Sequence, residues 1–101
     1  MAAYGISAVR YSNGQIGELW MGLLEQQGVL RWVARPSPLR LSAVIDRILG
    51  GDSVAAVIEQ QTGELVAGPA AQIAMQSEFD ETLAFPSNAT GPTIEDLPHV
   101  A

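Results

Sequence analysis

The side chains best suited to acid–base chemistry or metal binding in this 101-residue chain are carboxylates, because it has one histidine and no cysteine. Glu78, Asp80 and Glu81 form the densest group, and residues 95–96 are a second acidic pair. Such groups can act as an acid/base pair or bind Ca²⁺ or Mg²⁺ through oxygen. Their spacing does not match an EF-hand loop, which needs a central glycine and a closing glutamate. We therefore predict an acidic surface at Glu78, Asp80 and Glu81 that faces a basic partner, with no catalytic residue, metal or other cofactor.

The single histidine, His99, lies two residues from the end of the chain and follows Pro98. A general base needs a fixed orientation within hydrogen-bond reach of its target, and a fraying terminus does not provide one. We expect His99 to be a solvated tail residue. Without cysteine, thiolate chemistry is excluded, and the chain is predicted not to be an enzyme.

Aromatic and cationic side chains suited to recognition are concentrated in the first 35 residues. Tryptophan, tyrosine and arginine dominate binding hot spots because they bury a large area and keep a polar group. We predict a sheet face that binds a second copy of the chain or another protein through Tyr11, Trp20, Arg31, Trp32 and Arg35. Two alternatives stay open: one tryptophan fills the core beneath a helix while the arginines contact solvent, or a small ligand binds in the concavity of the sheet.

Charge is divided unevenly along the chain. All five arginines lie in residues 1–50 with three carboxylates, whereas residues 51–101 carry eight carboxylates and no cation. The net charge of −6 disfavours nucleic acid and anionic membranes, whose binding requires Lys and Arg. It favours a basic protein partner or head-to-tail contacts between copies. The low charged content of 16% also suggests that part of the surface is covered in a homo-oligomer.

The composition also suggests an origin and a location. Five arginines with no lysine and many alanines are typical of a GC-rich bacterial genome, so we expect a bacterial or phage-type protein. There is no apolar stretch of about eighteen residues to cross a membrane. The N-terminus has no basic segment followed by an apolar run, as a secretory signal would. We expect a cytoplasmic protein.

The elements that would position these side chains begin with an antiparallel meander over residues 4–35. Asn13-Gly14 separates two β-rich runs and is a strong hairpin signal, because both residues tolerate the positive φ of a type I′ turn. Centring the turn there pairs Ala8 with Leu19 and Ile6 with Met21, which places apolar side chains on one face. A further turn at 26–28 leads to a third strand over residues 29–34.

We expect the prolines of residues 35–38 to break the sheet. Apolar residues at helical spacing then predict a helix over residues 41–49: Leu41, Val44, Ile45, Ile48 and Leu49. Ser42 is a plausible N-cap, or alternatively Ser37 with Pro38 at the first helical position. Gly50-Gly51 supplies a left-handed stop.

The second half of the chain opens with a predicted hairpin around residues 61–63, in which Ile58 faces Val66 and Ala56 faces Gly68. Residues 70–76 are interpreted as a further strand, with a short helix as the alternative. Beyond Ser77 the pattern is lost. Ile94 and Leu97 are expected to contact the core, and residues 86–93 and 98–101 are candidates for disorder.

Together these patterns predict an α+β fold: a curled antiparallel sheet of five to six strands packed against one amphipathic helix. Residues 1–85 would form the single domain and residues 86–101 an irregular acidic C-terminal tail. An open sheet that is completed in a dimer is the alternative. The function we expect is that of a small non-enzymatic interaction or assembly protein, with a small-ligand-binding module as the alternative.

Overall fold

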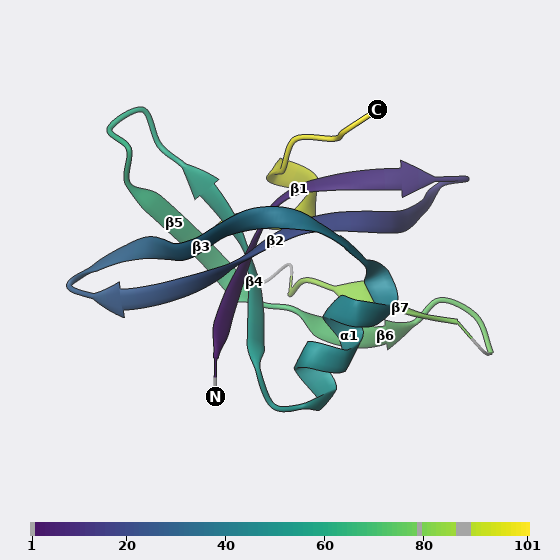
Figure 1. Ribbon diagram of the computed structural model, residues 1–101. Coiled ribbons are helices and arrows are strands. Elements are labelled where there is room, and N and C mark those ends of the chain that lie inside the picture. The colour runs from purple at the N-terminus through teal and green to yellow at the C-terminus, as the bar shows by residue number, and fades with distance from the viewer. Residues whose placement is uncertain (1, 79, 87–89) are drawn as a thin grey trace.

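The computed structural model describes residues 2–78, 80–86 and 90–101 (Figure 1). Within these residues the elements follow the order β1 (Ala3–Ser12), β2 (Gln15–Gln27), β3 (Val29–Arg40), α1 (Leu41–Leu49), β4 (Ser53–Glu59), β5 (Leu65–Ala70), β6 (Gln72–Met75), β7 (Glu81–Ala84) and the 3₁₀ turn η1 (Ile94–Asp96). The predicted α+β class with a single helix packed on a sheet is confirmed for the part of the chain described.

The main sheet has five strands in the order β3-β2-β1-β4-β5, and β6 pairs with β7 in a separate two-stranded sheet. All neighbours in the main sheet are antiparallel except β1 and β4, which are parallel. The prediction of a purely antiparallel sheet is therefore wrong for one pair. The chain leaves β3, passes through α1 and returns beside β1, so the helix serves as a crossover connection. The two edge strands, β3 and β5, also contact each other.

The first hairpin turns at Asn13-Gly14 as predicted, with φ of 53° and 76° at the two residues. Ile6 pairs with Met21 as expected, but Leu19 pairs with Val9, and Ala8 pairs with Trp20. A β-bulge between Ile6 and Ala8 causes this shift. The extra residue lets both Ile6 and Val9 point into the core, where each is fully buried.

The third strand does not end at the prolines. β3 continues through residues 35–38 to Arg40, and Pro38 pairs with Trp20 on β2. The prediction that these prolines break the sheet is wrong because β3 lies at an edge, where the missing N–H can face away from the neighbouring strand.

Helix α1 spans the predicted residues 41–49, and Val44 and Ile45 are its buried residues. Leu49 is 68% exposed, so the apolar stripe ends one residue earlier than predicted. Arg40 occupies the N-cap without a side-chain hydrogen bond, so neither predicted serine cap is observed. Gly51 has a φ of 98°, in agreement with the predicted left-handed stop.

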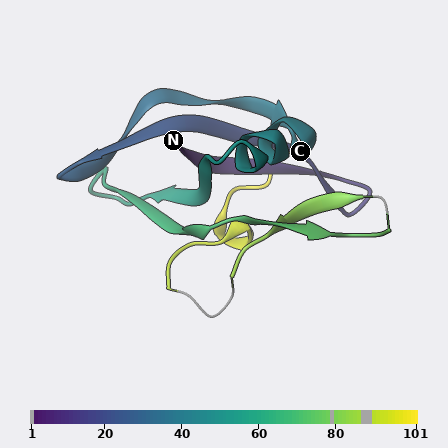
Figure 2. The same cartoon turned by 90° about the horizontal axis from the view of Figure 1, so that it is seen from below.

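The second hairpin pairs Ile58 with Val66, as predicted. The predicted pairing of Ala56 with Gly68 is not observed, because the register shifts between Ala55 and Val57, and Ala55 pairs with Ala70 instead. The interpretation of residues 70–76 as a strand is confirmed by β6. Its partner β7 was not predicted from the sequence. Figure 2 shows β6 and β7 on one side of the main sheet together with the C-terminal segment.

Residues 90–101 pack against the rest of the fold. Ile94 and Leu97 are buried in the core, as predicted. The Val9 N–H donates to the Pro98 carbonyl and the Val100 N–H to the Val9 carbonyl, so residues 98–100, expected to be disordered, run beside β1. Residues 87–89 of the other predicted disordered stretch lie outside the described residues.

The main core lies on one face of the five-stranded sheet, beneath α1, β7 and the C-terminal segment. It contains Ile6, Val9, Leu19, Met21, Val44, Ile45, Val54, Ala56, Leu83, Ile94 and Leu97. Within the part of the chain described, no helix has the length and apolar character needed to cross a membrane.

Candidate functional site: the tryptophan face of the sheet

Both tryptophans lie on the sheet face opposite the main core. Trp20 sits between Leu19 and Met21, which are buried in that core, and side chains alternate along a strand. Trp32 contacts Gly5, which precedes the core residue Ile6. Neither tryptophan belongs to the core beneath α1, so the alternative in which one of them fills it is wrong. Both are half-buried, and we call their side of the sheet the tryptophan face.

Trp32 rests on two glycines that pair directly across β1 and β2, Gly5 and Gly22. A Cβ at Gly5 would lie 2.8 Å from Cη2 of Trp32, and a Cβ at Gly22 would lie 2.9 Å from Cε3. The six-membered ring of Trp32 therefore occupies the space that Cβ atoms would need if Gly5 and Gly22 were any other residues. Val57 and Leu24, both buried, also contact the position of Gly5.

The glycine pair is a packing feature of this face that was not predicted from the sequence. The signal was available, because the predicted pairing of Ile6 with Met21 also places Gly5 opposite Gly22. A glycine inside a strand often marks the close approach of another group. What the sequence did not indicate is that the approaching group is Trp32.

A pocket of about 400 Å³ opens beside Trp32. Its lining residues come from β1, β3, β4, β5 and the C-terminal segment: Ser7, Trp32, Val57, Ile58, Glu59, Leu65, Asp96 and Pro98. Aromatic and aliphatic side chains thus lie next to two carboxylates, and the lining contains no Lys or Arg. We call this the Trp32 pocket.

A second pocket of about 430 Å³ lies between the β2–β3 turn and β5. It shares Leu65 with the Trp32 pocket, and Leu30, Val66 and Glu64 are among its other lining residues. The two pockets therefore adjoin along β5. Again no Lys or Arg lines it.

Trp20 is covered by a cation from its own chain. The guanidinium carbon of Arg10 lies 5.3 Å from the centroid of the Trp20 ring. Arg10 also forms an ion pair with Glu18, its cross-strand partner. A cation over a tryptophan ring is attracted by the ring quadrupole, so Arg10 stabilises the position of the Trp20 ring on this part of the face.

Tyr11, at the end of β1, packs against His99, with ring centroids 4.9 Å apart and planes tilted by 57°. Burial, and secondarily the negative charge of Glu95, raises the pKa of the Tyr11 hydroxyl. The backbone of His99 also forms an isolated parallel β-bridge with Val9. The His99 side chain is exposed, as expected for a solvated histidine, but the terminus does not fray there, because residues 98–100 are bonded to Val9.

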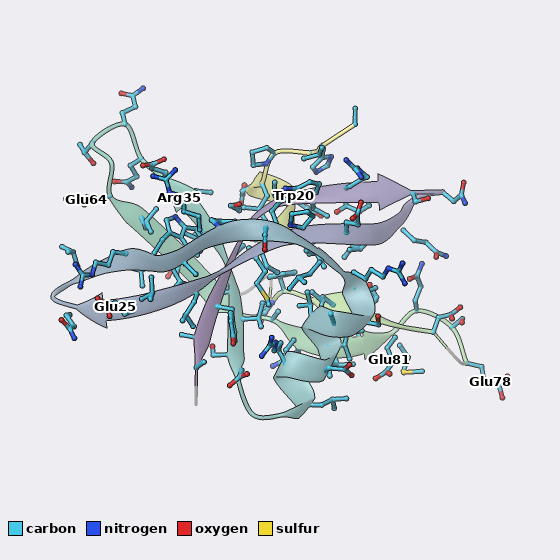
Figure 3. The ribbon with its side chains drawn as sticks, viewed as in Figure 1. Trp20, Glu25, Arg35, Glu64, Glu78 and Glu81 are labelled. Atoms are coloured by element: carbon cyan, nitrogen blue, oxygen red, sulfur yellow. The ribbon has the colours of Figure 1, made fainter. Side chains whose placement is uncertain are left out.

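The arginines predicted for the same surface are dispersed. Arg31 bonds to Glu25 near the turn of the β2–β3 hairpin. Arg35 is exposed on β3. Figure 3 shows Glu25 and Arg35 on the part of the hairpin nearer its turn, with Trp20 further along.

The acidic cluster lies elsewhere. Glu78 and Asp80 are exposed in the β6–β7 connection, and Glu81 is exposed at the start of β7. Ser77 donates a hydrogen bond to Asp80, with 3.0 Å between the oxygens. Figure 3 shows Glu78 and Glu81 well separated from Trp20. Among the described residues, no three His, Asp or Glu side chains are grouped to hold a metal ion.

Comparison of the chain with protein-family models, with curated proteins and with solved structures found no match.

Proposed function

We propose that this chain is a small non-enzymatic interaction or assembly protein of bacterial or phage type, which binds a second copy of itself or another protein through the tryptophan face. One observation carries the proposal: Trp20 and Trp32 share the sheet face that α1 leaves uncovered. Both rings are only half-buried, so a partner can still remove aromatic surface from water.

The composition of the face supports this role. Tryptophan combines a large apolar area with an N–H group that can bond to a partner. Arg10 covers Trp20, and Tyr11 lies at the end of the same strand. A rigid sheet holds these side chains with little freedom to lose on binding, which favours affinity. Arg31 and Arg35 would contribute at the rim.

The net charge of −6 and the lack of cysteine support a protein partner rather than nucleic acid, and a reducing compartment such as the cytoplasm. The exposed acidic cluster at Glu78, Asp80 and Glu81 would steer a basic partner from a distance, since it lies outside the tryptophan face.

Sedimentation over a wide concentration range, combined with affinity capture, tests the proposal with two matched variants. Trp20→Ala removes a ring from the tryptophan face, and Leu49→Ala removes an apolar side chain that is 68% exposed on α1. We expect Trp20→Ala to weaken association by about tenfold or more, the size of a hot-spot effect. Leu49→Ala should leave it unchanged. The proposal is contradicted if the wild type is a monomer at all concentrations and if wild type and Trp20→Ala capture the same partners.

The Trp32 pocket favours a second candidate, a module that binds a small ligand. Its volume of about 400 Å³ is within the range of ligand sites, and Trp32 is a fluorescent reporter in its wall. A ligand screen should shift tryptophan emission in the wild type and not in Trp32→Phe. If no ligand class shifts it, this candidate is wrong.

A further inference from the structure

We propose that the Trp32 pocket receives an arginine or lysine side chain projecting from a basic protein partner. The inference rests on the proposed function and specifies the chemistry of the partner. It begins from the lining of the pocket, in which an aromatic ring and aliphatic groups stand beside the carboxylates of Glu59 and Asp96. A cationic group on an apolar stem fits such a lining, because the stem contacts the apolar side chains and the charge meets the ring and the carboxylates.

The carboxylates of the pocket are not neutralised by the chain's own cations. Within the residues described, the ion pairs join Arg10 to Glu18 and Arg31 to Glu25. Neither Glu59 nor Asp96 takes part. Oδ2 of Asp96 accepts a hydrogen bond from the Thr93 N–H at 2.9 Å, which fixes the orientation of this carboxylate without cancelling its charge.

The two tryptophans differ in a way that indicates where an external cation binds. Trp20 already has the Arg10 guanidinium over its ring, and Arg47 lies 5.3 Å from the Tyr4 ring centroid in the same manner. These are the cation–aromatic contacts found in the described part of the chain. Among the described residues no cation lies over Trp32, and the carboxylates beside it are in no ion pair, whereas Glu18, near Trp20, is paired with Arg10.

The surroundings favour a protein over a small free cation. The Trp32 pocket adjoins the second pocket along β5 through Leu65, and Glu64 lines that second pocket. A polypeptide can occupy both pockets at once, with one side chain at Trp32 and its neighbours along β5. The negative charge around both pockets complements a basic segment.

The test uses the full chain and two synthetic peptides, one with a single arginine between glycine and serine residues and one with citrulline in its place. Citrulline keeps the shape of arginine and removes the charge. Binding is measured by calorimetry at low ionic strength. We expect the arginine peptide to bind and the citrulline peptide to bind about tenfold more weakly or not at all. Equal binding of the two peptides, or no binding of the arginine peptide, overturns the inference.

Two variants locate the effect. Glu59→Gln removes a charge from the pocket, and Asp46→Asn removes the same charge from an exposed position on α1. We expect Glu59→Gln to weaken binding of the arginine peptide about tenfold and Asp46→Asn to leave it unchanged. Equal losses in both variants would mean general charge attraction and would overturn the inference. Thermal unfolding of Glu59→Gln verifies that its fold is intact.

Other occupants give different results. If free arginine binds as tightly as the peptide, the site takes a small cation and the inference is wrong. If Glu59→Gln and Arg35→Gln each abolish self-association, the occupant is a second copy, and the basic-partner assignment is also wrong. The proposed function is tested separately by the association of Trp20→Ala. If Trp20→Ala loses association but the wild-type chain does not bind the arginine peptide, the pocket assignment alone is wrong.

Discussion

Substitution of Gly68 by alanine tests how tightly the C-terminal segment is held to β5. A Cβ at Gly68 would lie 1.7 Å from the carbonyl oxygen of Pro92 and 2.8 Å from its carbonyl carbon. These are backbone atoms, so no side-chain rotation relieves the clash. Gly68 or residues 90–93 must move, and Pro92 is itself buried.

The size of the effect follows from what that movement disturbs. Accommodating an extra methyl in a packed region costs about 1–3 kcal/mol. Complete release of the segment would expose Ile94 and Leu97, which are 9% and 3% exposed in the fold. Each such side chain contributes about 1.5–3 kcal/mol when buried. We expect Gly68→Ala to lower the free energy of unfolding by about 2–4 kcal/mol, between these limits.

Urea unfolding followed by tryptophan fluorescence measures the loss, and Gly17→Ala is the matched control. Gly17 also lies in a strand, but its nearest neighbour to a new Cβ, the Arg10 carbonyl oxygen, is 3.4 Å away. We expect this control to be neutral or to stabilise by about 0.5–1 kcal/mol, since alanine loses less backbone entropy than glycine.

Hydrogen exchange identifies where the loss arises. The amides of Val9 and Val100 bond across the junction between β1 and the C-terminal segment, so Gly68→Ala should speed their exchange more than that of amides in the β1–β2 ladder. If Gly68→Ala is as stable as Gly17→Ala, the packing of residues 90–93 on β5 is not as the structure shows it.

Three further predictions address other parts of the fold. Trp32→Ala empties the space over Gly5 and Gly22 and should cost about 3 kcal/mol of unfolding free energy in the same urea assay; a loss below about 0.5 kcal/mol would show that the ring is not packed there. The Tyr11 hydroxyl should titrate above the ordinary tyrosine pKa of about 10, because burial and then Glu95 raise its pKa. The contribution of Tyr11 to stability is therefore complete below the ordinary tyrosine pKa and is lost as the pH rises through the raised pKa of the folded state. Spectrophotometric titration of the wild type and of Tyr11→Phe isolates the Tyr11 signal as the difference between the two curves. A difference signal with an ordinary tyrosine pKa would contradict this prediction. Leu49→Ser, at an exposed position, should change the unfolding free energy by no more than about 0.5 kcal/mol, and a larger loss in urea would mean that Leu49 is covered.

The candidate site could be predicted only in part. The aromatic composition indicated a recognition surface, and strand alternation was sufficient to place Trp20 opposite Leu19 and Met21. The predicted register also implied the Gly5–Gly22 pair. The contact of Trp32 with that pair could not be derived, because the β2–β3 register contains shifts near Leu23 that no local pattern encodes. The same holds for Glu59 and Asp96, which come from β4 and the C-terminal segment and meet at one pocket.

Local patterns in the chain were enough to establish the α+β class, the helix at residues 41–49 and the turn at Asn13-Gly14. Helical period and turn chemistry are properties of a few consecutive residues, so they can be read without knowing the neighbours. The parallel approach of β4 to β1, the passage of β3 through its prolines and the docking of residues 98–100 beside Val9 required the folded molecule. Each depends on which distant segments pack together, and that choice is made by many weak contacts across the whole core rather than by any one stretch of sequence.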